Sequence, residues 1–196
     1  MKRNSIILLS IAGVLLLSIL WGVSKYNGLV SKDEAVNGQW ANVENQYQRR
    51  ADLIPNLVAT VKGYATHESS TLEGVVAARA KATQITIDPT KMTAEKLQQY
   101  QAAQGELTTA LGKLLMITEN YPELKANQNF LELQAQLEGT ENRITTERGK
   151  FNDLSKEFNA SIRKFPTSIV ASIGGFEKKA YFEAEQGSEK APTVKF

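Results

Sequence analysis

The sequence contains no cysteine and one histidine, His67, among its 196 residues. The lack of cysteine excludes disulfide bonds, thiolate metal sites, cysteine nucleophiles and a lipid-modified cysteine anchor. A lone histidine also excludes the paired ligands of zinc-protease helices and of di-iron bundles. His67 stands beside Thr66, Glu68 and Ser69, residue types that are common at helix caps, so we interpret this stretch as an exposed turn.

Glycine-rich phosphate loops and clustered acidic residues are also missing. Asp33, Asp88 and Asp153 are isolated from one another, which excludes a calcium loop. The sequence therefore predicts no catalytic residue, no metal site and no cofactor.

A basic field is absent as well. From Val30 onward the chain has 20 basic and 21 acidic residues, so that this part is close to neutral and nucleic acid is excluded as the expected partner. Strand signals are almost absent. The prediction is an all-α protein.

The first apolar stretch runs from Ile6 to Val23 without a charge and would form a helix of about 27 Å, enough to span a bilayer. Lys2 and Arg3 precede it, which predicts that residues 1–5 lie in the cytoplasm and the body outside. The alternative is a cleaved signal peptide, but the flank Trp21-Gly-Val-Ser-Lys25 lacks a small-x-small cleavage site. We expect an uncleaved signal anchor over residues 6–23 of a cytoplasmic (inner) membrane protein, with the lipid bilayer as its first partner.

A long amphipathic stripe follows the anchor. Its members, spaced alternately by four and three residues, are apolar or aromatic except Arg50: Val36, Trp40, Val43, Tyr47, Arg50, Ile54, Leu57, Val61 and Tyr64. The capping box Ser31–Glu34 predicts that a new helix begins near Lys32 and runs to about Tyr64. Because the stripe keeps its phase past Pro55, we expect a kink there and not an end.

Further caps divide the rest of the chain. The box Ser70–Glu73 predicts a helix from Thr71 to about Gln84, and Thr93 is expected to cap a third that ends near Glu119. A fourth helix should begin near Glu123 or Asn127 and run to Lys164, before a short helical segment over Thr167–Ile173.

The fourth helix carries a heptad repeat with polar positions along its seam, which is typical of a coiled coil. The repeat is Phe130, Leu137, Ile144, Phe151, Phe158 and Phe165, and the polar seam positions include Gln134, Glu141, Arg148 and Asn152. Helices of this length joined by short loops predict an antiparallel helical bundle over 31–182, with a flexible tail over 183–196.

Several blocks of sequence resemble the LemA family of bacterial membrane proteins. They include Tyr26-Asn-x-Leu-Val30, Arg49-Arg-x-Asp-Leu-Ile-Pro-Asn-Leu-Val58, Glu119-Asn-Tyr-Pro-x-Leu-Lys-Ala-Asn127, Leu137-Glu-Gly-Thr-Glu-Asn-Arg-Ile144 and Ala191-Pro-x-Val-x-Phe196. The resemblance covers nearly the whole chain, in order. It implies an N-terminal membrane helix and an antiparallel helical body outside the cytoplasm, and supplies no molecular activity.

Arg50 is the most informative polar residue, because its phase directs it into the bundle, where a charge must be paired. Glu141 is the expected partner and Glu119 the alternative, and Arg148 lies one heptad after Glu141. The network could hold a ligand or ion, or it could set the register of the helices.

Two classes of function follow. The first is a non-enzymatic membrane scaffold or adaptor whose partner is an envelope or membrane protein. The second is a small-ligand receptor or enzyme that uses the polar seam. The tail ends in Val194-Lys195-Phe196, which would suit strand addition to a partner through Val194 and Phe196. Alternatively, these residues fold back on the body or stay disordered.

Overall fold

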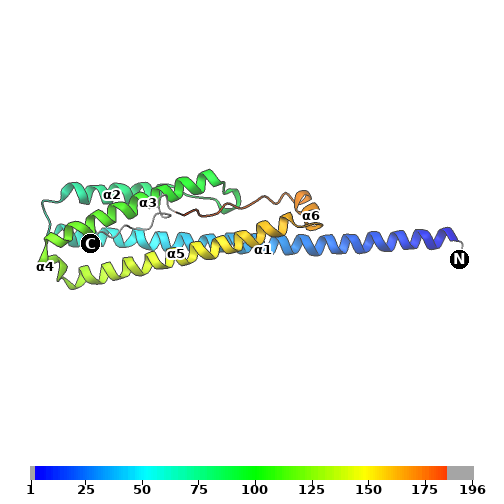
Figure 1. Cartoon of the computed structure of the whole chain (residues 1–196), viewed down its shortest axis with the longest axis horizontal. Coiled ribbons are helices and arrows are strands. Elements are labelled where there is room, and N and C mark those ends of the chain that lie inside the picture. The colour runs from blue at the N-terminus through cyan, green and yellow to red at the C-terminus, as the bar shows by residue number, and fades with distance from the viewer. Residues whose placement is uncertain (1–2, 185–196) are drawn as a thin grey trace, which may run out of the picture.

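The computed structural model describes residues 3–184, and it has the shape of a rod with one helix running its full length (Figure 1). That helix, α1 (Arg3–Lys62), contains 60 residues and is about 90 Å long. It passes Pro55 without ending.

The predicted helix start near Lys32 is wrong, because α1 is continuous through the anchor and into the body. A capping box needs backbone amides that have no partner at a helix start. The amides near Ser31 lie inside α1 and donate to carbonyls of the preceding turn. The Ser31 hydroxyl instead donates to the Asn27 carbonyl at 3.0 Å, one turn back in the same helix.

The N-terminal third of α1 stands alone beyond the body (Figure 1). Within the described residues, α1 is the one helix long and apolar enough to cross a membrane: its most apolar 18-residue window has a mean hydropathy of 2.4 and no buried residue. Leu8, Leu17 and Ile19 expose 61–69% of their surface. Apolar side chains that no protein covers are what a lipid-facing helix presents.

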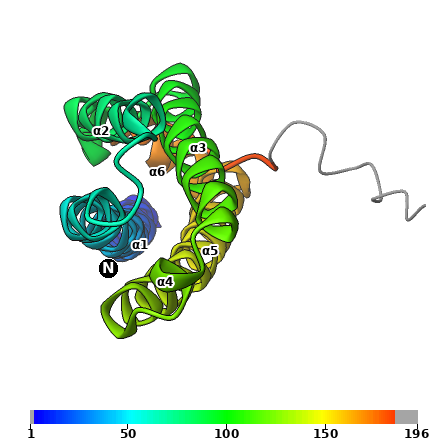
Figure 2. The ribbon, with the colours of Figure 1, turned by 90° about the vertical axis from the view of Figure 1, so that its left-hand side faces the viewer.

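Among the described residues, four long helices form most of the body, and Figure 2 shows them end-on. α5 (Gln128–Arg163) packs along α1, and α2 (Ser69–Gln84) pairs with α3 (Ala94–Ile117) in a hairpin whose α2 also packs on α1. Short elements fill the connections: the 3-10 turns η1 (Pro89–Lys91) and η2 (Thr118–Asn120), α4 (Pro122–Lys125) and α6 (Thr167–Ile173). The all-α bundle predicted from the sequence is confirmed, with no strand in residues 3–184.

Side-chain caps mark the starts of two long helices. Thr93 accepts a hydrogen bond from the Lys96 amide, and Asn127 accepts one from the Phe130 amide, so α3 and α5 begin with their first donors satisfied. The predicted box at Ser70 is wrong: α2 begins at Ser69, after Glu68, whose side chain makes no capping bond.

The apolar stripe of α1 divides into two core clusters. The cluster nearer the membrane span surrounds Trp40, with Tyr100 and Phe151 at ring-centroid distances of 5.4 and 5.7 Å. The distal cluster surrounds Ile54 and Leu57. Arg50 lies in α1 between these two clusters.

Two residues that the apolar repeats placed in the core lie outside it. Tyr64 is 40% exposed because α1 ends at Lys62, and Phe165 is 82% exposed because α5 ends at Arg163. Once each helix stops, the helical period no longer fixes where the next side chain points.

The chain returns along the body after α6. Residues 176–184 contain no helix and run beside α3 and α5 toward the distal end (Figure 1). Gly175 begins this return with a φ of +70°, a left-handed conformation that favours glycine.

Candidate functional site

Arg50 lies at the centre of a polar network inside the body. It is 1% exposed and donates from Nη1 to Glu141 Oε2 at 2.8 Å and to Thr108 Oγ1 at 2.9 Å. Its Nη2 donates to Gln104 Oε1 at 2.7 Å and to the Gln104 carbonyl at 3.2 Å. One guanidinium on α1 therefore binds α3 and α5 together.

The network extends to the remaining long helix. Gln104 Nε2 donates to the Ala82 carbonyl at the end of α2, at 3.2 Å. Arg79 of α2 in turn donates from Nε to the Ala51 carbonyl of α1 at 2.8 Å. These polar contacts fix the relative positions of all four long helices, which is the register role that buried polar groups serve in coiled coils.

The ion pair is buried on one side only. The Arg50 side chain is 2% exposed, whereas the Glu141 side chain is 46% exposed. Water thus solvates the carboxylate while protein atoms surround the guanidinium, which also lies 5.2 Å from the centre of the Tyr47 ring. Arg50 Nε is buried without a hydrogen-bond partner in the structure.

Burial also affects the two phenols next to the network. Desolvation raises the pKa of Tyr100 above its ordinary value of 10.0. It raises the pKa of Tyr47 as well, although the charges of Arg148 and Arg50 act in the opposite direction. Both side chains therefore stay neutral over a wide pH range and act as packing and hydrogen-bonding groups.

Of the other predicted polar residues, Arg148 lies beside the network and Glu119 lies away from it. Arg148 is half-buried and donates from Nη2 to the Glu183 carbonyl at 3.2 Å, with its guanidinium 4.8 Å from the centre of the Phe182 ring. Glu119 is exposed in η2. Arg50 is thus paired with Glu141, and Glu119 is not its partner.

A small recess opens beside the ion pair. It has a volume of about 50 Å³ and is lined by residues of α1, α3 and α5, among them Tyr47, Arg50, Gln104, Glu141 and Arg148. Sites for organic ligands are about 300–1,000 Å³, so this space suits water molecules.

Two asparagines of α5 hold the returning segment in an extended conformation. Asn159 accepts from the Lys179 amide at 2.8 Å and donates to its carbonyl at 2.9 Å. Asn152, seven residues earlier, makes the same pair of bonds with Phe182, at 2.8 and 2.9 Å. An amide side chain that binds both backbone groups of one residue replaces the neighbouring strand of a sheet.

Side chains of the returning segment contact α1. Phe182 is 6% exposed and stacks on Trp40 at 5.8 Å, and Lys179 forms an ion pair with Asp33 at 2.8 Å. The sequence did not predict these contacts. Asn152 is one of the predicted polar seam positions. Its partner in the extended segment could not be identified, because that segment has no repeating pattern of residues.

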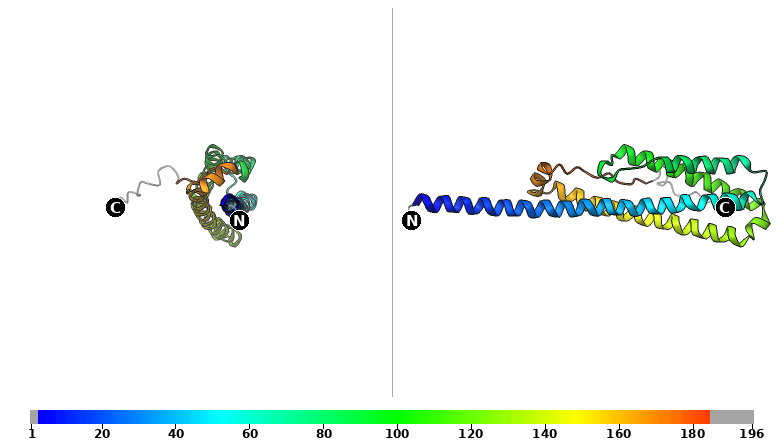
Figure 3. Two further views of the ribbon diagram at one scale, coloured as in Figure 1. Left: turned by 90° about the vertical axis from the view of Figure 1, so that its right-hand side faces the viewer. Right: turned by 180° about the vertical axis from the view of Figure 1, so that it is seen from behind.

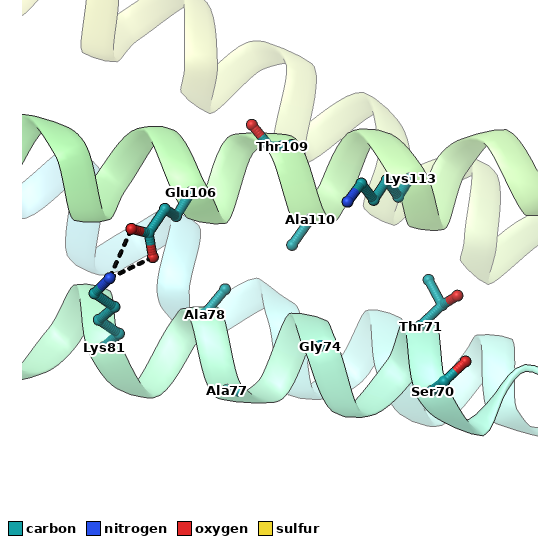
Figure 4. A pocket seen from close by; sticks show the side chains of 10 residues that line it. All are labelled: Ser70, Thr71, Gly74, Ala77, Ala78, Lys81, Glu106, Thr109, Ala110 and Lys113. Atoms are coloured by element: carbon teal, nitrogen blue, oxygen red, sulfur yellow. Dashed lines mark hydrogen bonds and ion pairs between the residues drawn. The ribbon is translucent and has the colours of Figure 1, made fainter.

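Grooves flank α2 on the outside of the body. The groove against α3 measures about 690 Å³, and the Lys81–Glu106 ion pair, at 2.6 Å, closes one end (Figure 4). Ala78 and Ala110 point toward each other across it (Figure 4). The groove against α1 measures about 440 Å³ and is mainly apolar, lined by Val58, Leu72 and Val76 among others.

His67 is exposed in the turn between α1 and α2. In the part of the chain that the structure describes, no group of three or more His, Cys, Asp or Glu side chains could hold a metal ion. The predicted recognition residues Val194 and Phe196 lie outside the described residues.

Comparison with known proteins gives matches over most of the chain. The model of the LemA family matches residues 39–196. Magnetosome protein MamQ 2 of Paramagnetospirillum magneticum is 26% identical, and the match covers 84% of this chain and 67% of that protein. Protein LemA of Metamycoplasma hominis is 24% identical, with 84% of this chain and 71% of that protein covered.

Proposed function

This chain belongs to the LemA family, and from that premise we propose that it is a membrane-anchored helical scaffold or adaptor of the cell envelope. The observation that carries the proposal is the contrast between the inside and the outside of the body. The recess beside the Arg50–Glu141 pair measures about 50 Å³, and a second one, lined by Tyr47 and Gln104 among others, about 280 Å³. The grooves that α2 presents on its two sides are larger, at about 690 and 440 Å³.

The outer face of α2 suits a partner helix. Gly74, Ala77 and Ala78 line the groove against α3 and allow a second backbone to approach closely. Val76, 51% exposed, offers apolar area to the same partner. We infer that this partner is an amphipathic helix of an envelope or membrane protein.

The location follows from the anchor and the charges before it. We propose a single-pass protein of the inner membrane with its N-terminus in the cytoplasm and the body on the periplasmic or extracellular side. The support is the unburied apolar part of α1 together with Lys2 and Arg3 in front of it. In this arrangement α2 is held away from the bilayer, at the free end of the rod (Figure 3).

The test places a photocrosslinking residue at Ala77 in intact cells and asks whether Gly74→Leu abolishes the crosslinked product. A Cβ added at Gly74 meets no atom within 4 Å, and Gly74 lines the groove, so we expect leucine to be accommodated by the fold and to extend into the groove. It should also stabilise α2, by up to about 1 kcal/mol, because leucine favours a helix more than glycine does. Loss of the product with unchanged or greater stability supports docking at α2.

Gly149→Leu is the matched control. Gly149 lies in α5, with equally open space at its Cβ, so the substitution brings the same gain in helix propensity on another face. A product that survives Gly74→Leu, or that both substitutions remove equally, would refute docking at α2.

The alternative function, a small-ligand receptor or enzyme, would use the recess beside Arg50. The unpartnered Nε of Arg50 favours it, since a buried donor is free to bind. The volume of about 50 Å³ opposes it, because a metabolite of ordinary size needs several times that space. We therefore assign the network to the architecture of the body and the grooves of α2 to its function.

A further inference from the structure

The short helix α6 and the residue two positions before it expose apolar side chains that no other part of residues 3–184 covers. Phe165, Ile169 and Ile173, spaced by four residues, are 82%, 53% and 84% exposed. Ile169 and Ile173 lie one turn apart on one side of α6, and Phe165 lies just before the helix begins. Ala171, 3% exposed, belongs to the side that packs on the body. Three exposed large apolar residues within nine positions are unusual on a surface that meets only water.

This apolar face lies where the body meets the membrane span. Gly174, directly after α6, is so close to Tyr26 that an added Cβ would lie 3.0 Å from its ring, and Phe176 packs on the same ring at 5.5 Å. Tyr26 is three residues beyond Val23, which is about 4.5 Å along the helix from the end of the predicted span. This is the depth of the headgroup region, where Tyr and Trp residues collect.

The orientation of α6 fits the plane of a bilayer. Seen from the N-terminal end, α1 points toward the viewer while α6 lies lengthwise across the view (Figure 3). Helices that bind a membrane surface lie in its plane with the apolar face inserted about 5–10 Å.

The charged residues that line one cleft at this level are all lysines. A cleft of about 310 Å³ between α1 and the end of α5 is lined by Lys25, Lys32 and Lys164 and by three hydroxyl residues, with no carboxylate among its lining residues. Lys32 donates from Nζ to Ser161 Oγ at 2.9 Å. Ammonium and hydroxyl groups grouped beside a membrane suit the phosphate of an anionic lipid headgroup.

We propose that α6 lies on the bilayer surface as an interfacial foot, with Ile169 and Ile173 inserted among the lipids while the lysine cleft binds an anionic headgroup. The foot goes beyond the proposed scaffold role, because it concerns contact with lipid and not with a protein partner. It acts on whichever side of the bilayer the body lies.

The full-length protein in lipid nanodiscs tests this proposal. Because the chain has no cysteine, Ile173→Cys gives one site for an environment-sensitive fluorophore. The probe should report an apolar environment, be quenched by spin-labelled lipid, and show several-fold weaker quenching by aqueous iodide than a probe at Met116→Cys. Met116, 69% exposed near the distal end of the body, is the matched control.

Equal iodide quenching at positions 173 and 116, in a protein whose helical circular dichroism is unchanged, would overturn the foot. Because a labelled cysteine could itself disturb α6, a second variant, Ile169→Trp combined with Trp21→Phe, repeats the measurement without a dye and leaves the core residue Trp40 as the one other tryptophan. A tryptophan that spin-labelled lipid fails to quench would overturn the foot independently.

Changing the lipid composition of the nanodiscs tests whether the cleft binds an anionic headgroup. Protection of the probe should be greater in phosphatidylglycerol than in phosphatidylcholine, and Lys25→Gln with Lys164→Gln should remove the difference. Equal protection in the two lipids would refute the headgroup site. If inorganic phosphate added to phosphatidylcholine discs reproduced the effect, the cleft would bind free phosphate and the lipid assignment would be wrong.

Discussion

Asn152 binds Phe182 through both backbone polar groups of that residue, its Oδ1 accepting from the amide and its Nδ2 donating to the carbonyl at 2.8 and 2.9 Å. Because these bonds contact only backbone atoms of the segment, they hold it extended but do not select which residue lies at this position. The side chain of Phe182, stacked on Trp40, fixes the register. Loss of either residue should therefore release the segment while the helices remain.

Asn152→Leu should release residues 176–184 from the body, because it leaves both backbone groups of Phe182 without their partner. Trypsin should then cleave after Lys178 or Lys179 several-fold faster, with no change in helical circular dichroism. Asn142→Leu, at an exposed position of the same helix, is the control and should leave the rate unchanged. An unchanged rate for Asn152→Leu would mean that its bonds do not hold the segment.

Arg50→Ala should destabilise the body by about 3 kcal/mol, because buried partners on α3 lose their donors and a cavity remains. Arg50→Met paired with Glu141→Leu should recover much of this loss, since an apolar pair needs no compensation for buried charge. Urea unfolding in detergent measures both. A loss below about 0.5 kcal/mol for Arg50→Ala would place the pair among surface ion pairs and contradict the buried network.

Stability should fall at alkaline pH. In the folded protein, burial raises the pKa of Tyr100, whereas the unfolded phenol ionises near 10.0. The unfolded state therefore releases a proton first, and folding weakens as the pH rises above about 10. Thermal melts from pH 8 to 11 should show this loss, and Tyr100→Phe should reduce it; an equal loss in both proteins would exclude Tyr100 as the cause.

The body should be accessible from outside the cytoplasm. Protease added to osmotically opened cells with sealed inner membranes is expected to digest it, because Lys2 and Arg3 retain the N-terminus inside. Membrane fractions should retain the full-length chain. Protection of the body, or a mature N-terminus after Val23, would contradict the anchor and its orientation.

The helical period of the sequence predicted which side chains of a helix point into the core. Trp40 and Phe151 follow from apolar spacing, and the position of Arg50 follows from the same phase. Glu141 could be proposed as its partner because a buried cation needs an anion, and few carboxylates lie on a facing seam.

Other features depend on contacts that no local pattern encodes. Ser31–Glu34 satisfies the rule for a helix start, yet the helix is already formed there and the serine hydroxyl binds the preceding turn. Asn159 lies in a helix, but its partner Lys179 lies in a segment without any period. Phe165 continues the heptad spacing in sequence after the helix itself has ended.

Because α1 is one continuous helix from its membrane part to Lys62, any tilt of the membrane part also tilts the body. Transmembrane helices tilt by about 20° on average, and a tilt of that size would swing the far end of α1 sideways by about 20 Å over the 39 residues beyond Val23. A thinner membrane would tilt the helix more, and a thicker one would hold it upright. The distance at which α2 could reach its proposed partner would therefore vary with the thickness of the membrane.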